Sequence, residues 1–332
     1  MAADKKIVAT DMEIPQDIVK QVSKVSRADF EVKKLQAIDA RRRGDVEALV
    51  LLASGLVNKK LFEDFPNMKL LQSMSAGVDF IDFTSIPDDV TVCSNGGAYK
   101  EPIAEHVFGM ILFFTKHLNR NHDRLRKGTF EVSTDGIFLA GKTMGVVGAG
   151  GIGQSVARVA KALNMRTIGI NTSGKAVPSF DAVWKMDRLG ELLKRSDFVV
   201  ISIPLNIHTR DLIDARRLGL MKEDAILVNV ARGPIISQPD LYAHLKAHPR
   251  FKAGIDVWWK YPKKGETFSP DFPFFELPNF LGSPHNADGV PEAIGEGQRH
   301  AFENVLRFIR GQPVERVVDK SNYKGFGGAR HP

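Results

Sequence analysis

The sequence has little cysteine and no long apolar run. Its 332 residues include one cysteine, Cys93, so the chain cannot form an internal disulfide, and a lone thiol is typical of a reducing compartment. The longest apolar stretch, 103–114, is interrupted by Glu105 and His106 and is too short to cross the hydrocarbon core of a bilayer. The N-terminus lacks the apolar segment of a signal peptide. We therefore expect a soluble, cytoplasmic protein.

Metal-ligand spacings and long runs of one charge are also missing. Neither C-x-x-C nor H-E-x-x-H occurs, so we expect no metal. The 46 basic and 39 acidic residues give a net charge of +7, but the longest basic run, 41–43, has no aromatic neighbours. Such an excess suits an enzyme that attracts anionic substrates. We expect neither nucleic acid nor a membrane as a partner.

What is present indicates an α/β protein. Composition is that of a globular chain, 43% apolar and 26% charged, and the length favours about two domains. Short apolar strands alternate with helical patterns, which predicts parallel sheets. Expected strands are 6–10, 48–52, 70–74 and 90–93 and, in a second series, 144–147, 167–170, 198–203, 225–230, 253–256 and 280–282. Expected helices are 101–118, 154–163, 189–195 and 291–311, the last packing onto the first domain.

A glycine-rich turn lies between the first strand and the first helix of the second series. It fits G-x-G-x-x-G and consists of Gly148, Ala149, Gly150, Gly151, Ile152 and Gly153. The pattern predicts a tight turn at Gly148, close approach of a pyrophosphate at Gly150 and close helix packing at Gly153. The helix N-terminus then faces the anion. The context of strand, turn and helix favours a dinucleotide site.

The next strand ends without the carboxylate that binds a ribose 2′-hydroxyl. In its place are Asn171, Thr172, Ser173 and Lys175. Hydroxyls, an amide and a lysine suit a 2′-phosphate. We therefore expect NADP to be preferred, with NAD or dual use as the alternative.

Five further motifs follow one another along the chain. They are Ser75-Ala76-Gly77-Val78-Asp79, Ala104-Glu105-His106, Pro204-Leu205 with Thr209-Arg210, Val228-Asn229-Val230-Ala231-Arg232-Gly233 and Ser283-Pro284-His285. Together with the glycine turn they resemble, in the same order and over about residues 45–315, the D-isomer-specific 2-hydroxyacid dehydrogenase family. This family includes glyoxylate and hydroxypyruvate reductases, phosphoglycerate dehydrogenases and formate dehydrogenases.

The resemblance implies a division of roles among these residues. Arg232 clamps the substrate carboxylate and carbonyl through its planar fork, and the amides of Ala76, Gly77 and Val78 hold the other carboxylate oxygen. His285 donates the proton in reduction and accepts it in oxidation. The resemblance also places Pro204, Val230, Ala231, Asp256 and His285 at the cofactor. The implied reaction converts a small 2-oxo acid, such as glyoxylate, hydroxypyruvate or pyruvate, to the D-2-hydroxy acid.

One position departs from the family pattern. Where the family usually has a glutamate that charges the catalytic histidine, this chain has Tyr261. A neutral phenol cannot raise the pKa of the histidine as a carboxylate does. Either the charged pair is lost, or Glu266 or Glu276 takes the place of the missing glutamate.

Two other functions stay open. Formate dehydrogenases share an aspartate–valine–tryptophan stretch similar to 256–258 but have an asparagine where His117 aligns. Dinucleotide-sensing corepressors also resemble the family, and a sensor does not need to turn over. Turnover of a 2-oxo acid would separate the enzyme from the sensor.

The resemblance further implies an architecture. We expect two Rossmann-like α/β domains with a cleft between them, the cofactor domain being inserted into the substrate domain. The substrate domain, flavodoxin-like, takes residues 1–99 and 288–332, and the dinucleotide-binding domain takes 100–287. A homodimer is implied, with the long helix and the loop 128–141 at its interface. The basic, glycine-rich tail 320–332 is expected to be mobile or to strap over a partner.

Overall fold

Two compact units make up the chain in the computed structural model, which describes residues 5–25, 30–52 and 54–326. The first unit runs up to Tyr99 and resumes at Val290, and the second runs from Lys100 to Gly289. Each unit contains one parallel sheet with helices around it. No helix of the described residues is both long and apolar enough to span a membrane.

The sheet of the first unit has five parallel strands in the order β2-β1-β3-β4-β5. These strands are β1 (Lys6–Thr10), β2 (Phe30–Lys34), β3 (Val46–Leu51), β4 (Leu70–Ser73) and β5 (Thr91–Cys93). The helices of this unit are α1 (Gln16–Val25), α2 (Lys59–Asp64) and α9 (Pro291–Ile309). The strand order is that of flavodoxin-like proteins.

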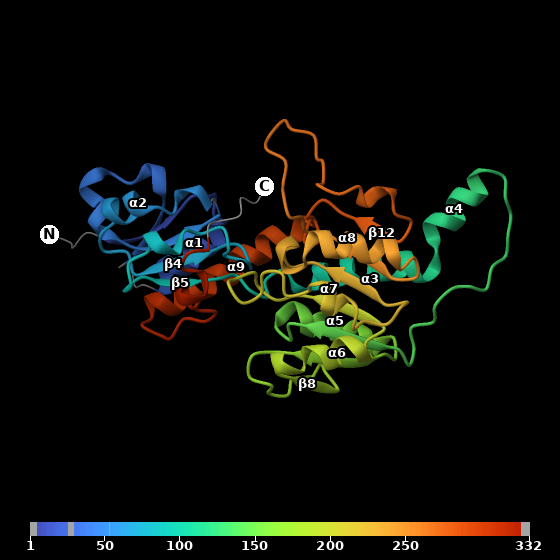
Figure 1. Ribbon diagram of the computed structural model, residues 1–332. Coiled ribbons are helices and arrows are strands. Elements are labelled where there is room, and N and C mark those ends of the chain that lie inside the picture. The colour runs from blue at the N-terminus through green and yellow to red at the C-terminus, as the bar shows by residue number, and fades with distance from the viewer. Residues whose placement is uncertain (1–4, 26–29, 53, 327–332) are drawn as a thin grey trace. The chain divides into compact units, whose positions relative to one another are not determined.

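Both faces of this sheet are covered, which explains why its strands are apolar throughout. Leu49 and Leu51 of β3 belong to one buried cluster, whereas Ala48 and Val50 belong to another on the opposite face. The second cluster includes Ala301, Phe302 and Val305 of α9, the helix drawn beside β4 in Figure 1. As expected, the last helix therefore completes the first unit.

The sheet of the second unit has seven parallel strands in the order β12-β11-β10-β9-β6-β7-β8. They are β6 (Thr143–Val147), β7 (Arg166–Ile170), β8 (Ala182–Trp184), β9 (Phe198–Ile201), β10 (Ile226–Asn229), β11 (Lys252–Ile255) and β12 (Phe280–Gly282). The helices are α3 (Lys100–Lys116), α4 (Leu118–Arg126), α5 (Gly151–Ala162), α6 (Leu189–Arg195), α7 (Ala215–Leu218) and α8 (Gln238–Ala247). The order reverses at β6, as in dinucleotide-binding folds.

Three expectations need correction. The sequence pattern predicts six strands in the second series, but the structure adds β8 at one edge, and it adds β2 at the edge of the first sheet. The long helix ends at Lys116, because His117 takes a left-handed conformation (φ 51°) before α4 begins. A single long helix is thus divided into two at this residue.

The tail is also not mobile where the structure describes it. The Lys320 ammonium donates to the carbonyls of Pro87, Asp88 and Val90 at 2.8–3.1 Å. Tyr323 is buried and stacks on Phe83 with ring centroids 4.7 Å apart. Residues 320–326 therefore pack on the first unit of this same chain, and the rest of the tail lies outside the described residues.

Candidate active site

Most of the predicted site residues of the second unit follow the carboxyl ends of its strands. Parallel strands end at one edge of the sheet, where doubly wound folds bind their ligands. The glycine turn follows β6, Asn171 follows β7, Arg232 follows β10, Asp256 follows β11 and His285 follows β12. The topology thus brings these separate motifs to one edge of a single sheet.

In the glycine turn between β6 and α5, two glycines are required by close packing of the protein, and a third has open space beside it. Gly148 has φ +115°, and a Cβ there would lie 2.7 Å from the carbonyl oxygen of Ser202. A Cβ on Gly153 would lie 2.0 Å from the carbonyl oxygen of Gly148. A Cβ on Gly150, the residue that caps α5, would meet nothing within 4 Å. Open space beside a helix N-terminus fits a dinucleotide pyrophosphate.

The loop after β7 is built by the side chain of Asn171. Its Oδ1 accepts from the Gly174 amide at 2.6 Å, and its Nδ2 donates to the Lys175 carbonyl at 3.1 Å. The side chains of Thr172, Ser173 and Lys175 are exposed. Asn171 therefore shapes the turn, and its neighbours present hydroxyls and an ammonium to solvent.

Arg232 stands in a turn that a buried amide holds in place. Asn229, fully buried at the end of β10, donates from Nδ2 to the Arg232 carbonyl at 2.9 Å and accepts at Oδ1 from the Ala231 amide at 3.0 Å. One guanidinium nitrogen of Arg232 donates to the Ala231 carbonyl at 2.8 Å. The side chain of Asn229 thus fixes the backbone of this half-buried arginine.

The rings of His285 and Tyr261 lie close together. Their ring centroids are 5.4 Å apart and their planes are inclined by 35°. The Tyr261 hydroxyl accepts a hydrogen bond from the Trp258 amide at 3.1 Å. His285 has φ +55°, an uncommon conformation for a residue with a side chain, and its amide donates to the Asp256 carbonyl at 2.8 Å.

Asp256 anchors the loop that carries the histidine, a role that sequence reasoning missed. Its carboxylate is 1% exposed and accepts from the Ser283 hydroxyl (2.5 Å) and from the amides of Asn286 (3.1 Å) and Ala287 (3.2 Å). Nε2 of His106, on α3, lies 3.0 Å from the Ser283 hydroxyl and 3.6 Å from the carboxylate. Helix α3 and the loops after β11 and β12 are therefore joined around the Asp256 carboxylate.

Three further carboxylates bear on the missing glutamate. Burial raises the pKa of Asp288, and the Asp256 charge adds to this increase, whereas Arg232 opposes it. No sequence motif marks Asp288. Glu266, one of the two expected substitutes, accepts instead from the Lys263 amide at 2.9 Å within its own exposed turn. The other, Glu276, lies in a short 3-10 helix, 274–276.

In the first unit, the predicted substrate loop follows β4. The amide of Ser75 donates to the Ser73 hydroxyl at 3.0 Å, and its carbonyl accepts from the Asn95 amide at 2.9 Å. The next three amides, of residues 76–78, donate to no protein group in the described part of the chain. Three consecutive free N–H groups can bind an anion such as a carboxylate.

Among residues 5–25, 30–52 and 54–326, no group of histidine, cysteine and acidic side chains could hold a metal ion.

Comparison with known proteins agrees with this geometry. Residues 108–287 match the family model of the D-isomer specific 2-hydroxyacid dehydrogenase, NAD binding domain. The chain is 31% identical over 289 residues to a glyoxylate reductase of Pyrococcus furiosus, covering 84% of each protein. It is 30% identical over 320 residues to a D-3-phosphoglycerate dehydrogenase of Methanocaldococcus jannaschii, covering 96% of this chain but only 60% of that protein.

The chain is also similar to a solved structure along almost its whole length. An acyclic imino acid reductase in complex with NADPH and D-Arg has a TM-score of 0.73 and 27% identity, with 95% of this chain and all of the other covered. The chain belongs to the D-isomer-specific 2-hydroxyacid dehydrogenase family, whose members are NAD(P)-dependent enzymes, and its cofactor is NAD or NADP.

Proposed function

We propose that this protein reduces a small 2-oxo acid to the corresponding D-2-hydroxy acid. The proposal rests on the positions of Arg232 and His285, which lie at the same edge of the sheet as the glycine turn. Buried Asn229 and Asp256 hold the two side chains' backbones. Glyoxylate reductases and a hydroxypyruvate reductase among the relatives support a substrate of this size.

In this proposal each residue has one task. Arg232 binds the substrate carboxylate and carbonyl oxygen through its planar fork. The free amides of Ala76, Gly77 and Val78 bind the remaining carboxylate oxygen. His285 delivers a proton to the carbonyl oxygen during reduction and removes it during oxidation. When bound, the nicotinamide supplies the hydride.

The same proposal assigns the cofactor contacts. The turn of Gly148, Gly150, Gly151, Ile152 and Gly153 receives the pyrophosphate, and Pro204, Val230, Ala231 and Asp256 line the remainder of the cofactor. Asn171 shapes the loop in which Thr172, Ser173 and Lys175 receive a 2′-phosphate. Since no carboxylate stands there, NADPH is the preferred cofactor.

Assembly and organisation are also proposals. Residues 1–99 with 288–332 form the substrate domain, and 100–287 form the cofactor domain. The family resemblance and the exposed apolar residues of 118–138 support a homodimer. A cytoplasmic location stays a prediction from the single cysteine.

The test follows absorbance of NADPH and NADH in parallel with glyoxylate, hydroxypyruvate, pyruvate and phenylpyruvate, and with formate in the opposite direction. We expect 2-oxo acid reduction that favours NADPH. Arg232→Lys should lower kcat/KM at least about 10²-fold because lysine cannot form the bidentate pair. His285→Gln should lower kcat by about 10²–10⁴-fold through loss of the proton donor. Arg216→Lys, an exposed arginine on α7, is the matched control.

Other outcomes identify the alternatives. Oxidation of formate without 2-oxo acid reduction would assign a formate dehydrogenase. Tight cofactor binding without turnover of any acid would assign the sensor, with Tyr261 as the decisive residue.

A further inference from the structure

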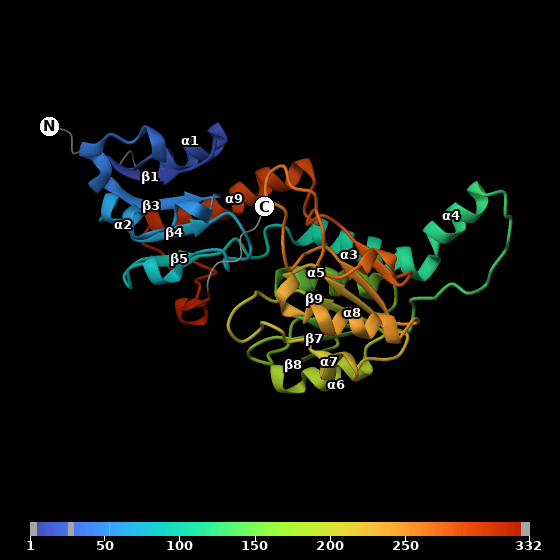
Figure 2. The same ribbon diagram turned by 45° about the horizontal axis from the view of Figure 1, so that its top comes forward.

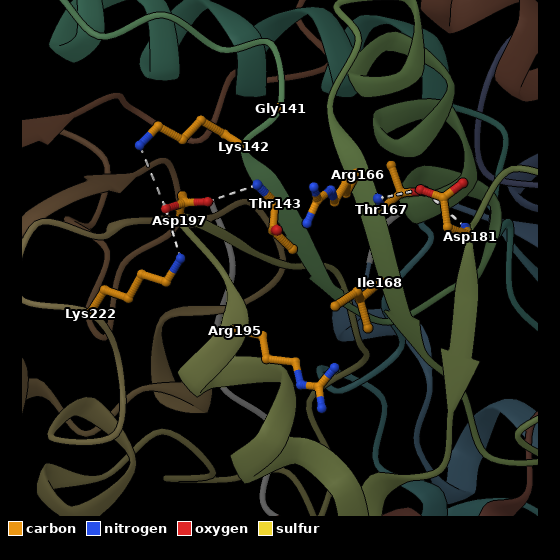
Figure 3. A pocket seen from close by; sticks show the side chains of 10 residues that line it. All are labelled: Gly141, Lys142, Thr143, Arg166, Thr167, Ile168, Asp181, Arg195, Asp197 and Lys222. Carbon is orange, nitrogen blue, oxygen red and sulfur yellow. Dashed lines mark hydrogen bonds and ion pairs between the residues drawn. The ribbon is translucent and has the colours of Figure 1, made fainter.

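A cavity lined by several charged side chains lies at the opposite edge of the seven-stranded sheet. It has a volume of about 800 Å³ and sits at the amino ends of β6 and β7 (Figure 3). Its lining residues are Gly141, Lys142, Thr143, Arg166, Thr167, Ile168, Asp181, Arg195, Asp197 and Lys222. All belong to the second unit. The glycine turn follows the carboxyl end of β6, about 15 Å away along a five-residue strand. The two sites are therefore separate.

The two aspartates of the cavity already form hydrogen bonds and ion pairs with other residues of the protein. Asp197 accepts from the Thr143 amide at 2.7 Å and pairs with Lys222 at 2.8 Å and Lys142 at 4.0 Å. Asp181 accepts from the Thr167 amide at 2.8 Å. These carboxylates thus hold the first residues of β6 and the start of β7.

Asp181 also pairs with one cation, Lys161, at 2.9 Å, and Glu191 is shared between Arg188 at 2.6 Å and Arg195 at 2.7 Å. Arg166 has no ion pair or side-chain hydrogen bond with any described residue, and Figure 3 draws no ion pair from Arg166 or Arg195 to the two aspartates.

Positive charge therefore exceeds negative charge around the cavity. The charged residues that line it are four cations, Lys142, Arg166, Arg195 and Lys222, and two carboxylates, Asp181 and Asp197, which leaves a surplus of two positive charges. Outside the lining, the ion-paired groups Lys161, Arg188 and Glu191 add one further positive charge. Close cations that outnumber their counter-ions repel each other, and a bound anion with several charges relieves this repulsion.

We propose that this cavity binds a small anion that carries two or more phosphate groups. Guanidinium groups such as those of Arg166 and Arg195 match phosphate oxygens in a fork, and the lysines add point charges. A single phosphate would leave part of the surplus positive charge unneutralised, whereas a pyrophosphate or oligophosphate group carries enough negative charge to neutralise it. The volume admits such a group with part of its hydration shell.

The test measures binding of pyrophosphate by titration calorimetry with the enzyme saturated with NADPH, so that the cofactor site cannot compete. We expect one saturable site. Arg166→Gln should weaken binding at least about tenfold through loss of a charge-assisted bidentate contact. This exposed residue has no described partner, so the variant should fold. Arg195→Gln is the second variant, and Arg216→Gln is the matched control that should bind like the wild type.

Citrate and tripolyphosphate at equal ionic strength separate carboxylate from phosphate chemistry. Binding of tripolyphosphate but not citrate supports a phosphate site, and equal binding of citrate overturns that choice of ligand. Several results overturn the site itself: no saturable binding, loss of binding on adding NADPH, an unchanged affinity in both arginine variants, or an effect that sodium chloride reproduces.

Discussion

At the scale of single residues, the proposed chemistry depends on side chains that do not themselves react. Asn229 fixes the turn of Arg232, and Asp256 fixes the turn of His285. A buried carboxylate is costly unless its lone pairs are satisfied, and Asp256 accepts from two amides and a hydroxyl. The energy of that network supports a left-handed histidine backbone that would otherwise be strained.

The first prediction concerns Tyr261, whose ring lies 5.4 Å from that of His285. In Tyr261→Glu a carboxylate beside the histidine favours its protonated form and raises the pKa of the imidazolium. Reduction needs a protonated His285, so the alkaline limb of the pH–rate profile should move upward by about one pH unit.

Tyr261→Phe is the control for this change. It removes the hydroxyl that accepts from the Trp258 amide but adds no charge, so the profile should keep its wild-type position. An unmoved profile in Tyr261→Glu, with the variant folded, would contradict the assignment of Tyr261 to the position of the glutamate.

The second prediction concerns the single thiol. Cys93 is fully buried at the end of β5, and burial raises its pKa to about 12. Since the thiolate is the reactive form, iodoacetamide at pH 8 should modify the folded protein very slowly and the urea-unfolded protein at the rate of a free thiol. Mass spectrometry of timed samples measures both rates. Rapid modification of the folded protein would show that β5 opens readily.

At the scale of elements, different glycines of the turn between β6 and α5 have different roles, one in packing and one in the proposed ligand binding. The Cβ of Gly153→Ala would stand 2.0 Å from the Gly148 carbonyl oxygen, so α5 must move away from β6. We expect this variant to lose both stability and NADPH affinity. Gly150→Ala has open space and should change the free energy of unfolding by at most about 1 kcal/mol.

The matched readouts are urea unfolding and NADPH fluorescence titration. Gly150→Ala should weaken NADPH binding although the protein stays stable, since the methyl group occupies the space proposed for the pyrophosphate. Unchanged NADPH affinity in Gly150→Ala would remove this turn from the proposed cofactor site.

The strands also show which elements could be predicted from the sequence pattern and which could not. Central strands such as β9 are buried on both faces and stand out as apolar runs. Of the edge strands, β12 also has the predicted bounds. The two strands that the patterns miss are edge strands. β2 reads Phe-Glu-Val-Lys-Lys and is only half-buried, and β8 has three residues. Edge strands need fewer apolar residues, so their signal is weak.

The candidate site divides in the same way. Motifs that are continuous in sequence, such as the glycine turn and the segment around Arg232, could be predicted because neighbouring residues carry their geometry. The contact of His106 with Ser283 joins residues 177 positions apart, and no local pattern encodes it. Asp288 is likewise placed by the folding of its loop around Asp256, which only the structure shows.

At the scale of the whole molecule, the segment 117–138 projects from the second unit. Figure 1 shows α4 and the following strand-less stretch reaching away from the rest of that unit. The stretch is nevertheless held in place. Arg120 pairs with Asp135 at 2.7 Å, and the Lys116 ammonium donates to the Ile137 carbonyl at 3.0 Å. An ordered projection of this kind suits contact with another chain.

Apolar side chains on this segment support the proposed homodimer. Phe130, Val132 and Phe138 are 75–85% exposed, and Leu118 and Leu125 are more than half exposed. Exposed apolar residues gathered on one segment are typical of an interface. The last prediction is therefore a mass of twice 36.7 kDa by light scattering, which Phe130→Glu with Val132→Glu should reduce to that of one chain. Ile294→Glu, at a position of α9 that is 67% exposed, should leave the dimer intact. A monomeric wild type, or a dimer that survives both glutamates, would refute this interface.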